Sequence, residues 1–219
     1  MSKKKQERKK QAFEFFIKHQ RPEEQARDPL VFYTQKEVTE YARSKALMRI
    51  QEGITKRALR ILEAEPPARV LDLGMGCGFA STYLRLKHYQ TVGIDINRMF
   101  LNFYDIPEIN PVHADMRQFA FRPEMFDFII SISAVQWVLA EPKLKKRTQY
   151  IKNIAEICNF VLKPGGKIIM QFYPKSDEAM KEFGGIIADT DHFSGNFIID
   201  NPDIPKKRRI FLYLEKPIH

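Results

Sequence analysis

The sequence contains only two cysteines, and they stand far apart. Cys77 lies in a glycine-rich segment and Cys158 in a segment with helical periodicity, so the disulfide framework of small secreted proteins is excluded. No cysteine and histidine spacing matches a zinc site, and no apolar run approaches the roughly 20 residues of a membrane span. The basic N-terminus lacks the apolar stretch of a signal peptide. These absences predict a cytoplasmic protein without a bound metal.

Acidic residues are also scarce relative to basic ones. The 27 acidic and 36 basic residues give a formal net charge of +9. Such an excess suggests a polyanionic partner such as RNA, and a solvated basic surface is the alternative. A length of 219 residues with 44% hydrophobic content suits one folded domain with appendages. We expect residues 1–65 to form a basic and helical segment that packs on a core domain at 66–219.

The N-terminal end of that segment has two interpretations. Residues 1–20 begin with a dense run of lysines and then turn apolar, with Phe13, Phe16 and Ile17 spaced for one helical face. The segment could be a basic helix that contacts RNA phosphates, or a solvated tail with one docked end.

One stretch of the chain says most about its chemistry. An apolar run at 70–73 is followed by Gly74, Gly76 and Gly78, and a second run ends at Asp95. This pattern is typical of the strand, glycine turn, helix and strand of a nucleotide-binding βαβ unit. Glycines permit positive φ and leave no Cβ in the way of a ligand. A carboxylate after the second strand can accept hydrogen bonds from both hydroxyls of an adenosine ribose.

The details favour S-adenosylmethionine over a dinucleotide. The dinucleotide fingerprint requires a small residue where this chain has Phe79. Asp72 would repel a pyrophosphate, whereas it suits a sulfonium cation and an ammonium group. The predicted cofactor-binding residues of this region are Asp72, Gly74, Gly76, Gly78, Asp95 and Ile96.

Strands and helices alternate along the rest of the chain. An amphipathic helix is expected from residue 44 to just before Pro66. A turn at 163–166 should separate a helix from its strand, with glycine past the helix end. Two β-rich runs, 196–200 and 209–214, have no helix between them and must pair antiparallel. The pattern predicts an α/β fold, a Rossmann-like doubly wound sheet with helices on both faces and an antiparallel C-terminal strand pair. Strands are expected at 69–73, 90–94, 110–114, 127–132 and 167–173, and helices at 79–87, 97–104, 145–162 and 177–189.

Ligands of such sheets bind beyond the carboxyl ends of the strands. After the third strand, Asp115 could accept from an adenine amino group with Met116 against the ring, or it could be a solvated acid. The single tryptophan, Trp137, could stack on a flat base or begin a packed helix. The sequence predicts Ser131 as a further cofactor contact and Ser133, Gln136, Trp137, Phe172 and Tyr173 as substrate contacts.

The loop after the fourth strand restricts the reaction. It reads Ser-Ala-Val-Gln-Trp, without the Pro-Pro of enzymes that methylate the exocyclic amine of adenine. Neither cysteine lies on a loop suited to a nucleophile for cytosine C5. A ring nitrogen such as guanine N7 has an exposed lone pair and no proton to lose, so positioning it in line with the methyl group suffices. We therefore expect no catalytic acid or base.

Longer blocks carry a family resemblance. They include Arg21-Pro22-Glu23-Glu24, Val31-Phe32-Tyr33, Tyr41, Ser131 through Trp137 and Gln171-Phe172-Tyr173-Pro174. With these, the chain resembles the guanine-N7 methyltransferases that modify small-subunit (18S) ribosomal RNA in eukaryotes, from about residue 21 onward. The resemblance implies a class I S-adenosylmethionine-dependent methyltransferase acting in ribosomal RNA processing. The eukaryotic enzymes carry a long basic C-terminal extension and this sequence stops at His219, so it is similar to a prokaryotic, archaeal relative.

The resemblance also implies partners. These are RNA of the small ribosomal subunit and a small zinc-ribbon activator protein, which would pair with the edge strand at 110–114. Two other functions stay open. The chain could methylate a small molecule or a protein on the same core, or it could be a ribosome-assembly factor with a vestigial cofactor site.

Overall fold

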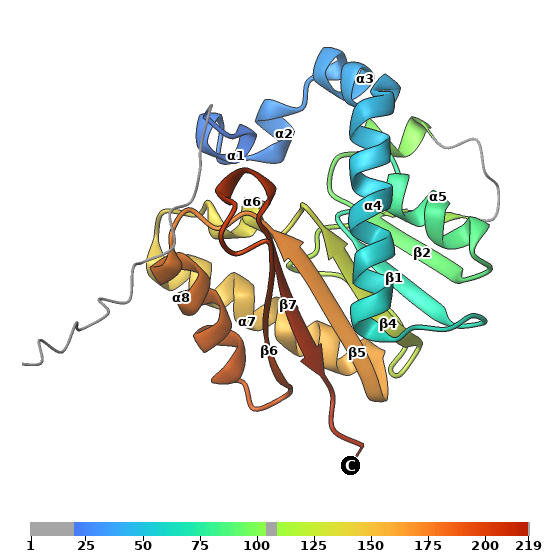
Figure 1. The fold of residues 1–219 in the computed structure, drawn as a ribbon, viewed down its shortest axis with the longest axis vertical. Coiled ribbons are helices and arrows are strands. Elements are labelled where there is room, and N and C mark those ends of the chain that lie inside the picture. Colours follow the sequence, from blue (N-terminus) through green and yellow to red (C-terminus); the bar gives the residue numbers. More distant parts are fainter. Residues whose placement is uncertain (1–19, 104–108, 219) are drawn as a thin grey trace, which may run out of the picture.

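A computed structural model describes residues 20–103 and 109–218 of the chain. The described residues form a seven-stranded sheet in the order β3-β2-β1-β4-β5-β7-β6 (Figure 1). Strands β1 to β5 are parallel, and β7 runs antiparallel to both of its neighbours. This confirms the predicted doubly wound sheet with an antiparallel C-terminal pair. The strands are β1 Arg69–Leu73, β2 Gln90–Asp95, β3 Asn110–His113, β4 Phe126–Ile132, β5 Leu162–Phe172, β6 Ser194–Asp200 and β7 Arg209–Glu215.

Helices cover both faces of the sheet. Helices α4 and α5 pack on one face, and α7 and α8 pack on the other. Within the described part of the chain, no helix is both long and apolar enough to cross a membrane. The helices are α1 Pro22–Gln25, α2 Pro29–Phe32, α3 Gln35–Arg43, α4 Lys45–Leu62, α5 Phe79–Leu86, α6 Gln136–Leu139, α7 Leu144–Val161 and α8 Asp177–Ala188, with 3-10 turns at Phe100–Phe103 and Pro205–Lys207.

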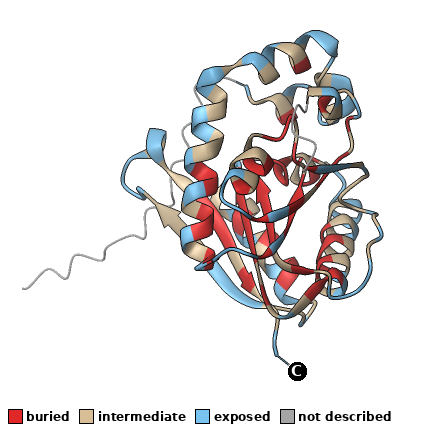
Figure 2. Ribbon diagram, turned by 90° about the vertical axis from the view of Figure 1, so that its right-hand side faces the viewer, coloured by how far each residue is buried: buried red, intermediate tan, exposed pale blue. Residues whose placement is uncertain are grey.

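The long helix α4 is amphipathic, as its sequence predicts. Ile54, Ala58 and Leu62 recur every four residues, so they lie on one face of the helix, and all three are fully buried in a cluster with Val70 of β1. Figure 2 shows this pattern, with buried residues on the side of α4 that faces the sheet. The expected division of the chain at residue 65 stays a prediction, and residues 1–19 with their basic run lie outside the described residues.

The alternation of β1 decides where its acid points. Successive side chains of a strand face opposite sides of the sheet. Leu71 and Leu73 join the core on the α7 and α8 side, while Val70 packs under α4 and α5. Asp72 therefore shares the face of Val70, and its Oδ2 accepts a hydrogen bond of 2.7 Å from Ser81 Oγ on α5. This bond fixes the acid beneath the start of that helix.

Two local predictions were wrong. The glycine pair expected to end α7 does not cap it, because the chain is already extended at Leu162 and continues into β5. Gly165, with φ of 72°, instead lets the strand bend, and its N–H donates to the carbonyl of Lys216 at 3.1 Å. The helix expected at 97–104 is only a 3-10 turn at 100–103 within the described residues. There the Asn97 side chain accepts from the Met99 N–H at 3.0 Å.

The N-terminal helices lie beyond the carboxyl ends of the parallel strands. Figure 1 shows α1 and α2 at this edge of the sheet, together with the loop that joins β6 to β7. Arg21, which precedes α1, donates to the carbonyls of Tyr173 and Pro174 just after β5. This contact holds the start of the described chain over the sheet edge where ligands of α/β proteins bind.

Candidate active site

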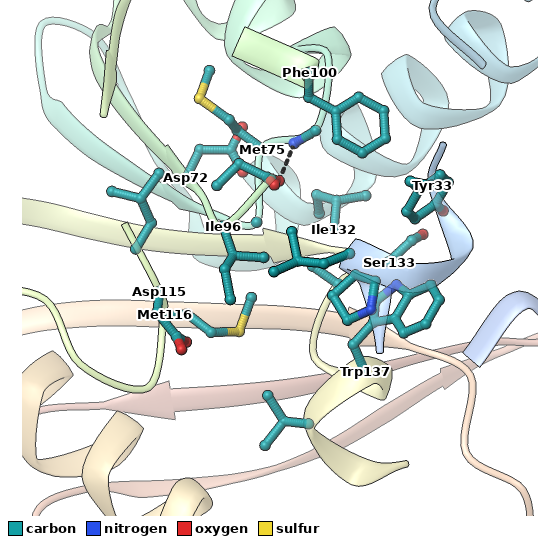
Figure 3. Close-up of a pocket in the computed structure, with 18 of the residues that line it drawn as sticks. Tyr33, Asp72, Met75, Ile96, Phe100, Asp115, Met116, Ile132, Ser133 and Trp137 are labelled. Atoms are coloured by element: carbon teal, nitrogen blue, oxygen red, sulfur yellow. Dashed lines mark hydrogen bonds between the residues drawn. The ribbon is translucent and has the colours of Figure 1, made fainter. Parts of the chain in front are cut away.

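A cavity of about 290 Å³ opens at the carboxyl ends of β1, β2 and β4. Its walls come from the loops after β1, β3 and β4 and from the segment that carries α2 and α3. Figure 3 shows Asp115 and Met116 at one end, Tyr33 and Trp137 at the other, and Ile132 and Ser133 between them. The cavity thus brings together parts of the chain that are more than one hundred residues apart in sequence.

The glycine loop after β1 forms one wall. Gly74 has a φ of 75° and its N–H donates to the carbonyl of Ile94 at 2.9 Å. A Cβ on Gly74 would stand 2.4 Å from the Cβ of Ala134, whereas a Cβ on Gly76 would meet nothing within 4 Å. The first glycine therefore permits a close approach to the loop after β4, and the second leaves room in the cavity. Gly78 begins α5 with a φ of 80° and does not line the cavity.

Asp95, at the end of β2, lines the cavity and is held from two sides. Its Oδ2 accepts from the Gly76 N–H and its Oδ1 from the Asn97 N–H, both at 2.8 Å. Burial raises the pKa of Asp95, and the two backbone donors act in the opposite direction. Each carboxylate oxygen can accept a further hydrogen bond. The arrangement presents a fixed pair of acceptors, as recognition of two vicinal hydroxyls requires.

Asp72 is the second acid of the cavity and is only 1% exposed. Burial raises its pKa to about 7, the bond from Ser81 lowers it, and the charge of Asp95 raises it again. A cation bound beside Asp72 would favour the ionised form. The position therefore suits a ligand that carries positive charge.

Asp115 lies at the other end of the cavity and is already paired. Arg117 donates to its carboxylate from Nε at 2.9 Å and from Nη2 at 2.6 Å, and the guanidinium lies 4.7 Å from the centre of the Tyr150 ring. Asp115 and Met116 both line the cavity, as do Ile94 and Ile96. The expected contact of Asp115 with an adenine amino group stays a prediction.

Trp137 packs against the N-terminal segment. Its ring centre lies 5.6 Å from that of Tyr33 and 6.0 Å from that of Phe32. Trp137 is the second residue of α6, and its contacts agree with the interpretation that it begins a packed helix. Because it also lines the cavity, its expected stacking on a base stays a prediction.

Ser133 links the cavity to a buried chain of polar groups. Its φ is +56°, an unusual conformation for a residue other than glycine, and its Oγ bonds with Gln171 Oε1 at 2.8 Å. Gln136 Nε2 donates to the Ser133 carbonyl at 2.9 Å. Gln136 therefore supports the loop and does not itself line the cavity, although we expected it to contact substrate.

Three other expected site residues also lie away from the cavity. Ser131 is fully buried and donates from Oγ to the Leu73 carbonyl at 2.8 Å, because the alternation of β4 places it on the same face as Ile129, toward α7 and α8. Phe172 is fully buried in the core on the α7 and α8 face, 5.2 Å from the ring of Phe183. Tyr173 is the residue that accepts from Arg21 through its carbonyl.

Several lining residues were missed from the sequence. Tyr41 stacks on Phe79 with ring centres 5.7 Å apart, and Tyr33 meets the edge of Phe100 at 4.9 Å. Burial raises the pKa of both tyrosines. No local pattern marks them, since they reach the cavity through the packing of α2 and α3 over the sheet. Tyr33 and Tyr41 do fall within the blocks that carry the family resemblance.

Comparison with known proteins identifies the chain. The family described as a methyltransferase domain matches residues 71–170. The chain is 29% identical to the 18S rRNA (guanine-N(7))-methyltransferase bud23 of Schizosaccharomyces pombe, over 89% of this chain and 74% of the relative. It is 33% identical to the 18S rRNA (guanine(1575)-N(7))-methyltransferase of Saccharomyces cerevisiae, over 84% of this chain and 68% of the relative. The chain belongs to the 18S rRNA (guanine-N(7))-methyltransferase family.

Solved structures agree on the fold. The N-methyltransferase NodS of Bradyrhizobium japonicum, in complex with S-adenosylhomocysteine, matches with a TM-score of 0.59 at 14% identity, over 84% of this chain and 98% of that one. A putative methyltransferase of Haloferax volcanii, in complex with the Trm112 methyltransferase activator, matches with a TM-score of 0.60 at 18% identity, over 83% and 98%. The class I methyltransferase fold is confirmed. This family member is an S-adenosylmethionine-dependent methyltransferase, as predicted.

The residues of the cavity fit that cofactor. Asp95 offers a fixed carboxylate to the ribose hydroxyls, and Asp72 offers negative charge to the cationic amino acid end. The open space beside Gly76 admits a ligand close to the backbone. Apolar side chains of Ile96 and Met116 suit a flat purine ring. The same cavity would bind a pyrophosphate poorly, because two buried acids lie where the negative charge of the pyrophosphate would be placed.

Proposed function

We propose that this methyltransferase modifies N7 of a guanine in the RNA of the small ribosomal subunit. The observation that carries the proposal is the kinship to relatives named for this reaction, which covers most of the chain. The lining of the cavity is consistent with it. No histidine or cysteine lines the cavity within residues 20–103 and 109–218, and an N7 lone pair needs no base to remove a proton.

The chain's own contribution to this reaction is therefore binding and orientation. S-adenosylmethionine, when bound, supplies a methyl group activated by the adjacent sulfonium. Asp95 would hold the ribose of the cofactor and Asp72 its amino acid end. The aromatic side chains of Tyr33 and Trp137 would exclude water and limit the space for a flat base. Orientation of two reactants in a closed site can account for a large part of the rate of such a transfer.

An RNA substrate is supported by the distribution of charge. Strand β6 runs parallel to β5, so the loop after it lies at the carboxyl edge of the sheet. That loop carries exposed Lys206 and Lys207, and the start of α7 at the same edge carries exposed Lys143 and Lys145. We name these four residues the edge lysines. They flank the face on which the cavity opens, where phosphates of a long substrate would run.

A Trm112-type activator is the partner we propose for β3. This strand forms one edge of the sheet and pairs only with β2 in the described chain. Asn110 and Pro111 are exposed, and an unpaired edge can take up a further strand from a partner. The Haloferax volcanii relative in fold is seen with such an activator. Co-expression with the activator should raise the yield of soluble protein. The methyltransferase and the activator should then elute together on gel filtration.

One experiment tests the proposed function. The purified chain, with its activator, is incubated with small ribosomal subunits from cells that lack this enzyme and with S-adenosylmethionine carrying a labelled methyl group. Mass spectrometry of the digested RNA should find label on one 7-methylguanine. The Asp95→Ala variant should leave the RNA unlabelled. Label on another atom, another RNA or a metabolite would overturn the proposal.

A further inference from the structure

The amino acid end of the cofactor carries a carboxylate as well as an ammonium group. Both groups are attached to the same carbon, so they must be bound close together. Asp95 suits the ribose and Asp72 suits the ammonium group, but the two acids would repel the carboxylate. A carboxylate accepts hydrogen bonds and needs donors where it leaves water. The cavity must therefore offer donors near Asp72.

The backbone of the glycine loop is already engaged. The N–H groups of Gly74 and Met75 both donate to the carbonyl of Ile94, at 2.9 and 3.0 Å. The Gly76 N–H donates to Asp95 Oδ2 at 2.8 Å. These are the loop residues between β1 and α5 that line the cavity. Because their amides are used within the protein, the carboxylate has to be bound by side chains.

The basic side chains of the cavity are engaged or exposed. Within residues 20–103 and 109–218, those that line it are Arg27, Arg117 and Lys146. Arg117 pairs with Asp115, and Lys146 pairs with Glu141. Arg27 is exposed to solvent. None of the three is a buried cation that could neutralise the carboxylate inside the cavity, so neutral donors have to bind it.

Two neutral donors lie side by side on the wall that α3 and α4 form. The Tyr41 hydroxyl and Gln51 Nε2 are 3.5 Å apart, and both residues line the cavity. Gln51 Nε2 is also 3.4 Å from Ser133 Oγ. Both contacts are at the long limit for a hydrogen bond, so the amide protons are available to a better acceptor. In the part of the chain that the structure describes, the Tyr41 hydroxyl has no other hydrogen-bond partner.

A chain of hydrogen bonds fixes which side of the Gln51 amide faces this wall. Gln171 is fully buried, and its Nε2 donates to the carbonyl of Phe172 at 3.3 Å. Its Oε1 accepts the proton of the Ser133 hydroxyl at 2.8 Å. The Ser133 oxygen can then only accept, so Gln51 turns its NH2 group toward it. Tyr41 is a donor as well, because burial raises its pKa and the hydroxyl keeps its proton.

Tyr41 and Gln51 lie on the side of the cavity where α5 begins. The Tyr41 ring stacks on Phe79, with ring centres 5.7 Å apart and 20° between the planes. Phe79 is the first residue of α5, and Ser81 of the same helix donates to Asp72. The two donors and the buried acid are thus gathered around one helix end. This is the arrangement that the two charged groups of one amino acid require.

We propose that the Tyr41 hydroxyl and Gln51 Nε2 bind the carboxylate of the cofactor, while Asp72 binds its ammonium group. A carboxylate has two oxygens, so it can accept from both donors at once. The amino acid end is then held by one acid and two neutral donors, without an arginine or a lysine. The inference depends on the cofactor and is independent of which base is methylated.

The test compares two ligands that differ only in the carboxylate. S-adenosylhomocysteine and decarboxylated S-adenosylhomocysteine are titrated into the full chain by isothermal calorimetry. Tyr41→Phe removes only a hydroxyl, and Gln51→Leu removes the amide at similar size. Each variant should bind S-adenosylhomocysteine about tenfold more weakly, because a hydrogen bond to a charged group is lost, and should keep its affinity for the decarboxylated ligand within about twofold. Tyr213→Phe, which removes a hydroxyl on β7 that bonds with Glu215, should bind both ligands as wild type does.

The ratio of the two affinities separates binding from packing. An equal loss for both ligands would mean that the variant disturbs the cavity wall, and the inference would be wrong. Unchanged affinity for both ligands would overturn it too. If Tyr41→Phe does not fold, as its thermal denaturation would show, Gln51→Leu decides by the same ratio. A wild-type chain that binds neither ligand would remove the inference together with the cofactor site, whereas absence of 7-methylguanine would remove the proposed function alone.

Discussion

At the scale of single residues, cofactor binding depends most directly on Asp95. The side chain is 9% exposed and oriented by two backbone donors. Replacing it with alanine removes charge-assisted hydrogen bonds worth about 1.5–3 kcal/mol each. We expect Asp95→Ala to weaken S-adenosylmethionine binding at least tenfold in isothermal calorimetry, with Asp189→Ala at an exposed position as the control. Equal affinity of the two variants would contradict the assigned role.

Asp72 predicts a dependence on pH. Its pKa in the folded protein is about 7, above the value of about 3.9 for an unfolded chain. Between these values the folded protein binds a proton that the unfolded chain releases, so the free energy of unfolding decreases as pH rises from 4 through 7. In Asp72→Asn this titration is absent. The ligand-free variant should therefore have a higher Tm than wild type at pH 8, and the difference should vanish near pH 4.

The same titration should govern the affinity for the cationic cofactor. Only the ionised form of Asp72 attracts positive charge, so affinity in the wild-type protein should rise about tenfold between pH 6 and pH 8. Asp72→Asn should bind more weakly at pH 8 and show a flat profile over this interval. Calorimetry at the two pH values measures both effects. A wild-type profile that is also flat would show that Asp72 does not contact the charged end.

Sequence predicted these acids because strand ends fix backbone position. Asp72 lies one residue before the end of the apolar run at 70–73, and Asp95 ends the next strand, so their place at the sheet edge needs no tertiary information. The side chains further along could not be assigned this way. Ser131 and Phe172 also lie near strand ends, yet the pleat of their strands directs both side chains to the buried face of the sheet and away from the cavity. Tyr33 reaches the cavity only because distant helices fold over it.

At the scale of elements, the two glycines of the loop after β1 differ in how much a side chain there would destabilise the fold. Gly74→Ala must accommodate a Cβ 2.4 Å from that of Ala134 and a φ of 75°, whereas Gly76→Ala faces open space at a φ of 55°. Positive φ costs an alanine about 1–2 kcal/mol. We expect Gly74→Ala to lower the denaturant midpoint more than Gly76→Ala. The reverse order would contradict the close packing of the loop on the segment after β4.

The ends of the elements were less predictable than their number and order. The apolar periodicity of α4 and the strand of β1 were apparent in the sequence, because each buries one face or stripe. The helix expected at 97–104 was wrong, since the side chain of Asn97 satisfies local backbone groups and competes with a helix. The turn expected at 163–166 was also wrong, because β5 begins at Leu162, before the two glycines. Hydrogen bonds between neighbouring strands decide this boundary, and the hydrophobic pattern of the sequence carries no information about them.

At the scale of the whole molecule, the charge of +9 becomes informative only through its placement. The edge lysines lie at the carboxyl edge of the sheet, with the cavity. Arg60, in the last turn of α4, and Lys87, just after α5, are exposed at the opposite edge, where β1 and β2 begin. If RNA crosses the cavity, the two sets of cations should differ in their effect on binding. Non-specific attraction to a basic protein would not distinguish them.

Replacing Lys145 and Lys207 with alanine should therefore weaken RNA binding and lower its dependence on salt. Each phosphate contact adds about 0.7–0.9 to the slope of log K against log salt, so the double variant should lose up to about 1.8 from the slope. The matched control, Arg60→Ala with Lys87→Ala, removes the same charge and should keep the wild-type slope. Fluorescence anisotropy with small-subunit RNA between 50 and 200 mM salt measures all three proteins. Because net charge is equal in the two variants, a different slope can arise only from where the cations lie, and equal slopes would remove the case for an RNA path across this edge.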